Sequence, residues 1–228
     1  MFKKTLVMSL GGSLIAPDDL DLNFLKKFRK LILDYVKKGN RVVLICGGGN
    51  TSRNYQKAAK AINQKSTSSD LDWVGIAATK LNAELVSAIF GDLAMESILS
   101  DPSKPVKTKR LIIVGAGFKP GSSSDKDAVL AARTFGAKTV INLSNITYVY
   151  NKDPRKFKDA KPQKKMTWSV FRKIVGNKYV PGAHWPFDPV ASKLAQKWRL
   201  NLVVMKGSDV SNLKNFLSGK KFKGTIIN

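Results

Sequence analysis

The sequence has very little cysteine and histidine. A single cysteine, Cys46, excludes an intramolecular disulfide, and together with the single histidine, His184, it cannot supply a structural zinc cluster. No uninterrupted apolar run reaches the roughly 18 residues that a membrane-spanning helix needs. Residues 1–17 are basic and then apolar, but the apolar run is short and ends in Gly-Gly-Ser, which predicts a buried first strand rather than a signal peptide. We therefore expect a cytoplasmic protein that does not bind a membrane.

Acidic residues are also scarce. The chain has 16 Asp and Glu against 40 Lys and Arg, which gives a formal net charge of +24 at pH 7. A field of this sign attracts polyanions, so nucleic acid is a candidate partner. No helix-turn-helix, zinc finger or aromatic RNA-binding motif accompanies the charge, and we expect nucleic-acid binding to be at most non-specific. The other interpretation is a lysine-coated enzyme whose substrates are anions.

The pattern of apolar residues alternates between strands and helices along the 228 residues. Short apolar runs predict strands, and apolar residues spaced three or four apart predict helices. The predicted strands are 5–10, 41–46, 110–117, 138–143, 146–150, 201–205 and 224–228. The predicted helices are 21–38, 52–62, 71–90, 125–136, 167–175, 188–199 and 209–217, and a polar loop with two prolines covers 99–109. This alternation predicts an α/β fold with a mainly parallel sheet and helices on both faces.

Three glycine-rich turns follow predicted strands, at 10–14, 46–50 and 115–125. Glycine lets successive backbone N–H groups converge on an anion, and a helix that starts directly behind adds further free N–H donors. The carboxyl ends of parallel strands meet at one edge of the sheet, where ligands bind in such folds. The turns match neither the P-loop nor the Rossmann fingerprint. The pattern favours phosphate binding over plain connection.

A few side chains near these turns could take part. Arg53 follows the second turn closely enough for its guanidinium to fold back onto a bound phosphate, although an exposed surface arginine is the alternative. Asp72 could accept hydrogen bonds from a sugar or could cap a helix. The hydroxyls of residues 122–124 could bind a ligand or stabilise the turn. For His184 a surface or packing role is more probable than catalysis.

Longer motifs show a resemblance to a known family. The stretches "ICGGGNTSRNY", "DWVGIAATKLNAELV", "KPGSSSDKDAV", "SNITYVYNKDP" and "FDPVASKLA" occur in the order and at the spacing of the amino acid kinase superfamily. Within it, the chain is most similar to the uridylate (UMP) kinases of the archaeal type. The resemblance implies a three-layer αβα sandwich with a mainly parallel central sheet. It also implies a single domain, 1–228, in which the lobe 1–137 binds UMP and the lobe 138–228 binds ATP, and a homo-oligomer that is a hexamer.

The same resemblance implies a reaction and a set of site residues. The γ-phosphoryl of ATP, carried with Mg²⁺, would pass to UMP to give UDP and ADP, with no metal ion held by the protein's own side chains. The implied UMP-binding residues are Gly48, Asp72, Phe118, Lys119, Pro120, Gly121, Ser122, Ser123 and Ser124. The implied ATP-binding residues are Gly12, Ser13, Gly49, Arg53, Ser144, Asn145, Tyr150 and Asp153. The candidate catalytic residues are Arg53, Lys119, Lys193 and Asp125.

The chain departs from the family pattern at two places. Ser9 stands where many members carry a first-strand lysine, and Thr147 and Tyr148 replace an acid and a glycine in the donor-site stretch. Two alternatives therefore stay open beside the UMP kinase. One is a kinase acting on another small phosphate or carboxylate, and the other is a nucleotide- or oxoanion-binding homologue without transfer activity.

Overall fold

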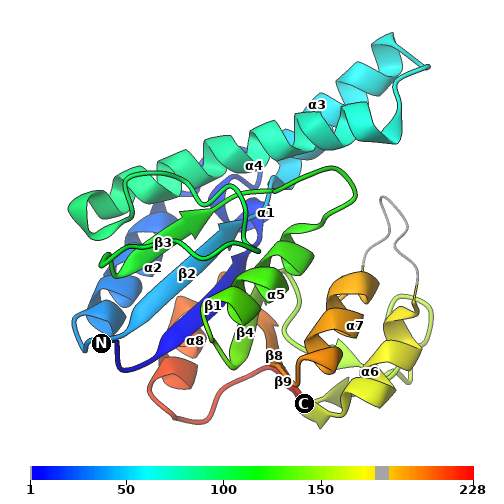
Figure 1. The fold of residues 1–228 in the computed structure, drawn as a ribbon. Helices are drawn as coiled ribbons and strands as arrows, with labels where there is room; N and C mark the ends of the chain where they lie inside the picture. Colours follow the sequence, from blue (N-terminus) through cyan, green and yellow to red (C-terminus); the bar gives the residue numbers. More distant parts are fainter. Residues whose placement is uncertain (1, 178–184) are drawn as a thin grey trace.

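The centre of the protein is a seven-stranded sheet with the order β3-β2-β1-β4-β8-β9-β7 (Figure 1). It is seen in a computed structural model that describes residues 2–177 and 185–228. Five neighbouring strands are parallel, whereas β9 runs antiparallel to β8 and parallel to β7. The strands of this sheet are β1 (Thr5–Leu10), β2 (Arg41–Cys46), β3 (Ile112–Gly115), β4 (Thr139–Ser144), β7 (Lys165–Met166), β8 (Asn201–Lys206) and β9 (Thr225–Ile227).

Helices cover both faces of the sheet (Figure 1). The helices are α1 (Gly12–Ile15), α2 (Leu22–Val36), α3 (Gly49–Ile62), α4 (Ser68–Phe90), the 3₁₀ turn η1 (Gly91–Leu93), α5 (Ser124–Thr134), α6 (Trp168–Val175), α7 (Pro189–Lys197) and α8 (Val210–Leu217). Alternate residues of β1 point to opposite cores, because side chains in a strand alternate between its two faces. Met8 packs in the core with α2, α4 and α8, and Val7 packs in the core with α5, α6 and α7. The predicted three-layer αβα sandwich with a mainly parallel sheet is confirmed.

Capping side chains fix the starts of α2 and α4, and both α3 and α4 begin three residues earlier than predicted. The Asp21 side chain accepts a hydrogen bond from the Phe24 N–H and caps α2, as expected. Helix α4 begins at Ser68 instead of residue 71, because Thr67 and Asp70 form a capping box. Asp72 therefore lies inside the helix, and its alternative role as an N-cap is wrong. Helix α3 begins at Gly49 instead of residue 52.

The segment between β4 and α6 differs most from the expectation. The predicted strand 146–150 shrinks to β5 (Val149–Tyr150), which pairs antiparallel with β6 (Pro162–Gln163) in a separate two-stranded sheet. Strands β6 and β7 have two residues each, too few to leave an alternating pattern in the sequence. Most of this segment therefore lies outside the main sheet as a basic loop with its own small hairpin, and β7 then joins the edge of the main sheet.

Helix α4 is unusually long and apolar. Within the described residues, the stretch Ser68–Leu93 alone has the length and composition of a membrane span. Ala83, Val86 and Phe90 on this helix are buried against the sheet. A core helix meets the same criterion of length and composition, and the packing of α4 identifies it as one.

Candidate active site

The loops that follow β1, β2, β3 and β4 lie at the carboxyl edge of the sheet. Because β1 lies between β2 and β4, the chain proceeds from β1 toward one side of the sheet and later returns to the other side. Such a switch point is where α/β sheets bind ligands. The Gly11 N–H donates to the carbonyl of Leu143 at 3.2 Å, so the first glycine turn contacts the end of β4. The three predicted glycine turns therefore share one edge.

The first two glycine turns pack backbone against backbone. A Cβ atom on Gly12 would lie 2.2 Å from the Gly49 nitrogen and 2.4 Å from the Gly47 carbonyl oxygen. Gly49 has a φ of +63°, and a Cβ atom there would lie 2.5 Å from the Gly12 carbonyl carbon. Helix α3 starts at Gly49 with no side-chain cap. The turns thus place the bare N-terminus of α3 beside the end of β1.

One face of α4 holds the glycine turns in place. The Asn82 side-chain amide donates to the Gly47 carbonyl at 2.8 Å. The Thr79 hydroxyl accepts from the Gly117 N–H at 2.8 Å, and the Asp72 carboxylate accepts from the Gly121 N–H at 2.8 Å. The roles of Thr79 and Asn82 were not predicted. Thr79 follows Asp72 by seven residues, and Asn82 follows Thr79 by three. This spacing puts all three on one helical face, and it is the signal that could have identified Thr79 and Asn82.

The third turn, between β3 and α5, is held by a buried carboxylate. Asp127 accepts hydrogen bonds from the Ser122 hydroxyl at 2.6 Å and from the Phe118 N–H at 3.2 Å. Burial raises the pKa of Asp127 to about 6, although both hydrogen bonds lower it. Ser123 caps α5 through the Lys126 N–H. Ser122 and Ser123 thus stabilise the turn itself, and sequence reasoning missed Asp127.

Asp125 joins three elements at the centre of the edge. One carboxylate oxygen accepts from the Ser9 hydroxyl on β1 at 3.1 Å, and the other accepts from the Asp188 N–H at 3.0 Å. Asp188 in turn caps α7 by accepting from the Ala191 N–H at 2.6 Å. Burial, with the nearby charges of Asp188 and Asp127, raises the pKa of Asp125 to about 7. Burial also raises the pKa of Asp188.

Arg53 folds back over the first turn. Its guanidinium donates to the Ser13 hydroxyl at 3.4 Å and to the side-chain oxygen of Asn50. The Asn50 amide contacts the Pro17 carbonyl. An exposed guanidinium is therefore held between the first two glycine turns, where the sequence analysis expected it to reach.

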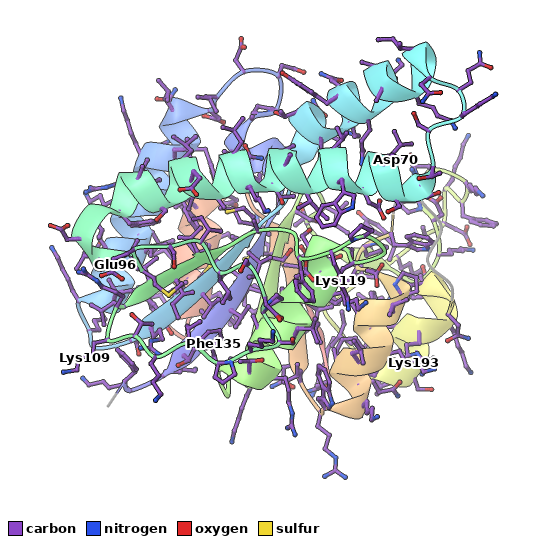
Figure 2. All side chains as sticks on the ribbon, turned by 45° about the horizontal axis from the view of Figure 1, so that its top comes forward. Asp70, Glu96, Lys109, Lys119, Phe135 and Lys193 are labelled. Carbon is purple, nitrogen blue, oxygen red and sulfur yellow. The ribbon has the colours of Figure 1, made fainter. Side chains whose placement is uncertain are left out.

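The two candidate lysines come from different elements (Figure 2). Lys119 lies in the third turn with its ammonium 5.1 Å from the centre of the Phe118 ring. Lys193 is exposed on α7, five residues after the Asp188 cap. Asp188 connects α7 to Asp125, so the position of Lys193 depends on the same carboxylate network.

The residues at the end of β4 and after it are not packed backbone against backbone as the first two glycine turns are. The backbone oxygen of Ser144 accepts from the Gly207 N–H at 2.8 Å, and Asn145 next to it is exposed. Tyr150 lies on β5 in the small second sheet. Both carboxylate oxygens of Asp153 accept from Arg155 at 3.0 Å, which holds the pKa of Asp153 below its usual value. Of the predicted ATP-binding residues, Ser144 ends β4 and Asn145, Tyr150 and Asp153 follow it, and the Asp153 carboxylate is already paired with Arg155.

His184 lies outside the described residues.

Comparisons with known proteins agree with this geometry. Residues 4–206 match the amino acid kinase family. The chain is 31% identical over 215 residues to a uridylate kinase of Sulfolobus acidocaldarius, covering 92% of this chain and 93% of that protein. It is 31% identical over 227 residues to a uridylate kinase of Methanospirillum hungatei, covering 98% and 94%. The crystal structure of a uridylate kinase from Archaeoglobus fulgidus matches with a TM-score of 0.83 at 26% identity, covering 99% of this chain and 100% of that one. The protein belongs to the amino acid kinase family.

Proposed function

We propose that the protein is an ATP-dependent UMP kinase, which transfers the γ-phosphoryl group of MgATP to UMP and releases UDP and ADP. The observation that carries the proposal is the packing of two glycine turns, backbone on backbone, beside the third turn at the switch point of the sheet. Bare N–H groups of this kind suit two phosphate-bearing substrates that meet head-on. The similarity over nearly the whole length to uridylate kinases supports the choice of UMP as the acceptor.

On this proposal the acceptor binds in the lobe 1–137. The third turn would surround UMP through the following residues, with Gly48 from the second turn: Phe118, Lys119, Pro120, Gly121, Ser122, Ser123 and Ser124. Asp72 holds this turn through the Gly121 N–H, and its second carboxylate oxygen remains to accept from a sugar hydroxyl. The acceptor site would therefore depend on α4 as much as on the turn.

The donor would lie across the same edge toward the lobe 138–228. The residues proposed to contact ATP are Gly12, Ser13, Gly49, Arg53, Ser144, Asn145, Tyr150 and Asp153. Gly12, Ser13 and Gly49 lie beside the Arg53 guanidinium, which would neutralise phosphate charge. Mg²⁺ would arrive as part of the MgATP substrate, bound by its phosphate oxygens. Among the described residues, no group of three His, Cys, Asp or Glu side chains could hold a metal ion by itself.

Phosphoryl transfer needs positioning and charge stabilisation more than covalent help. Arg53, Lys119 and Lys193 are the cations that we propose to stabilise the transferred group. Asp125 would act as a positioning residue, because its oxygens are occupied by the Ser9 hydroxyl and the Asp188 N–H. It would hold the end of β1, α5 and α7 in one arrangement around the substrates.

We further expect a cytoplasmic homo-oligomer, with a hexamer as the assembly. Four large apolar side chains on α3 and α4 are exposed in the single chain: Tyr55 at 68%, Ile62 at 89%, Trp73 at 53% and Leu81 at 65%. Exposed apolar side chains on neighbouring helices support an interface between copies. Light scattering coupled to size-exclusion chromatography measures the assembly directly.

The test of the proposed function is ADP release from MgATP by the purified protein with UMP, CMP, GMP, AMP or no acceptor. We expect release with UMP well above the other acceptors. Release with no acceptor at the same rate would indicate simple ATP hydrolysis and would contradict the proposal. Selective release with a different small phosphate or carboxylate would favour another kinase of the family.

A binding protein without transfer activity is the second candidate. Thr147 and Tyr148 replace an acid and a glycine after β4, and the Asp153 carboxylate is paired with Arg155. The first feature removes an acidic group and adds a ring where glycine would let the backbone approach ATP, and the second leaves the Asp153 carboxylate less free for ATP. Tight UMP binding without any ADP release would favour this candidate.

A further inference from the structure

A hollow lies between α6 and α7. Its volume is about 260 Å³, and five residues with polar side chains line it: Ser169, Arg172, Lys173, Asn177 and Gln196. None of these residues belongs to the proposed nucleotide site. Two of these five described residues are cations and none is an acid, so together they carry net positive charge.

Arg172 is fixed in this hollow by two neutral side chains. Its guanidinium donates to the Gln196 side-chain oxygen at 2.9 Å and to the side-chain oxygen of Asn177. Its Nε atom is buried and has no hydrogen-bond partner among the described residues. Within the same part of the chain, neither Arg172 nor Lys173 forms an ion pair with an acid. The charge of Arg172 is thus held in place without being neutralised.

This arrangement leaves mainly donors facing the hollow. Arginine has no acceptor atom, so Gln196 and Asn177 must turn their oxygens toward it and keep their NH₂ groups for another partner. The Lys173 ammonium and the Ser169 hydroxyl add further donors. Cations in the last turn of α6 also interact favourably with the helix dipole, which explains why two are present. The dipole does not explain the two amides that hold Arg172.

We propose that the hollow between α6 and α7 is a binding site for a small oxyanion, such as the phosphate group of a metabolite, separate from the nucleotide site. An oxyanion offers only acceptors and negative charge, which complements this set of donors. The site goes beyond the proposed kinase activity and does not depend on it.

Isothermal titration of inorganic pyrophosphate into the full-length protein at 150 mM salt tests the proposal, because salt suppresses diffuse attraction. The decisive variant is Gln196→Glu. It keeps an oxygen that accepts from Arg172, replaces the NH₂ donor by a second oxygen, and adds a negative charge that neutralises the charge of Arg172. We expect the wild type to bind one more equivalent of pyrophosphate than this variant. Lys173→Gln should weaken the additional site about tenfold or more, the loss expected for one charged hydrogen bond.

The control is Lys30→Gln on the exposed side of α2, which removes one positive charge far from the hollow in sequence. It should leave the additional site unchanged. The proposal is overturned if the wild type and Gln196→Glu bind the same number of equivalents, or if Lys30→Gln weakens binding as much as Lys173→Gln. It is also overturned if an oligonucleotide binds and pyrophosphate does not, since the surface would then recognise a long polyanion.

Discussion

The carboxyl edge of the sheet is built in two different ways. After β1 and β2, backbone packs directly on backbone, and Gly12 and Gly49 leave no space for a side chain. After β4, the chain leaves the main sheet for a small hairpin, where Asn145 is exposed and Asp153 is paired with Arg155. In the first region the close backbone packing requires glycine, whereas the second region has no such steric constraint. A side chain at Gly12 or Gly49 would collide with backbone, whereas no such collision restricts Thr147 and Tyr148.

The largest effect should follow from adding one methyl group to the first region. In Gly12→Ala the new Cβ would lie 2.2 Å from the backbone nitrogen of Gly49, so backbone must move. We expect the free energy of unfolding to fall by about 3 kcal/mol or more. Urea denaturation of the purified variant measures it.

The control for this variant is Gly219→Ala. Gly219 has a φ of +70° but no atom within 4 Å of its ideal Cβ position. Only backbone strain applies there, and we expect a loss of about 1 kcal/mol. Equal losses at both positions would contradict the tight packing of the two turns.

Arg53→Ala should have the next largest effect, on turnover rather than on folding. Arg53 is exposed and its guanidinium donates hydrogen bonds to Ser13 and Asn50, so the Tm should hardly change. We expect kcat to fall about 100-fold, since a cation at the transferred phosphoryl group would be lost. Lys57→Ala, one turn further along α3, is the matched control. Near-normal kcat in Arg53→Ala would remove Arg53 from the phosphate-binding role.

Asp125 should make stability depend on pH. Its pKa is about 7 in the folded protein and 3.8 in the unfolded chain, so between these values only the folded state keeps the proton. The free energy of unfolding therefore falls as pH rises from 4 to 7. Asn at this position can still accept from the Asp188 N–H and donate to the Ser9 hydroxyl. Asp125→Asn should reduce this decrease in the free energy of unfolding by about 2 kcal/mol. Urea denaturation of both proteins at a series of pH values measures it. Parallel pH profiles would contradict the claim that burial raises the pKa of Asp125.

The smallest effect is expected in the second region. The Asp153–Arg155 ion pair lies at the surface, with Asp153 partly exposed, and surface ion pairs contribute little to stability. Asp153→Asn should leave the Tm unchanged and raise KM for ATP a few-fold, with KM for UMP unaffected. Steady-state kinetics with each substrate varied in turn provide the measurement. An equal rise in both KM values would argue against a donor-side position.

The same contrast decides what could be predicted from the sequence. The alternation of apolar runs and helical spacing predicted the sheet and both helical layers. Buried strands appear in the sequence as short apolar runs, and the helices that cover them show apolar residues three or four positions apart. The glycine turns were visible because only glycine fits them. Strands β6 and β7 are too short to show a period. Asp127 binds the neighbouring third turn, and Asp188 caps α7 and binds Asp125, but an aspartate near a helix start looks the same in the sequence whether or not it makes such contacts. Thr79 and Asn82 shared a helical face with Asp72 and could have been found by that spacing.

The most direct test of the central claim follows the phosphoryl group itself. ATP labelled at its γ-phosphate is incubated with Mg²⁺, UMP and the purified protein, and the nucleotides are then separated. Label in the β-position of UDP, formed together with an equal amount of ADP, is the result that we predict. Bound UMP with all label remaining in ATP would contradict the claim and would identify a site that holds nucleotides without joining them.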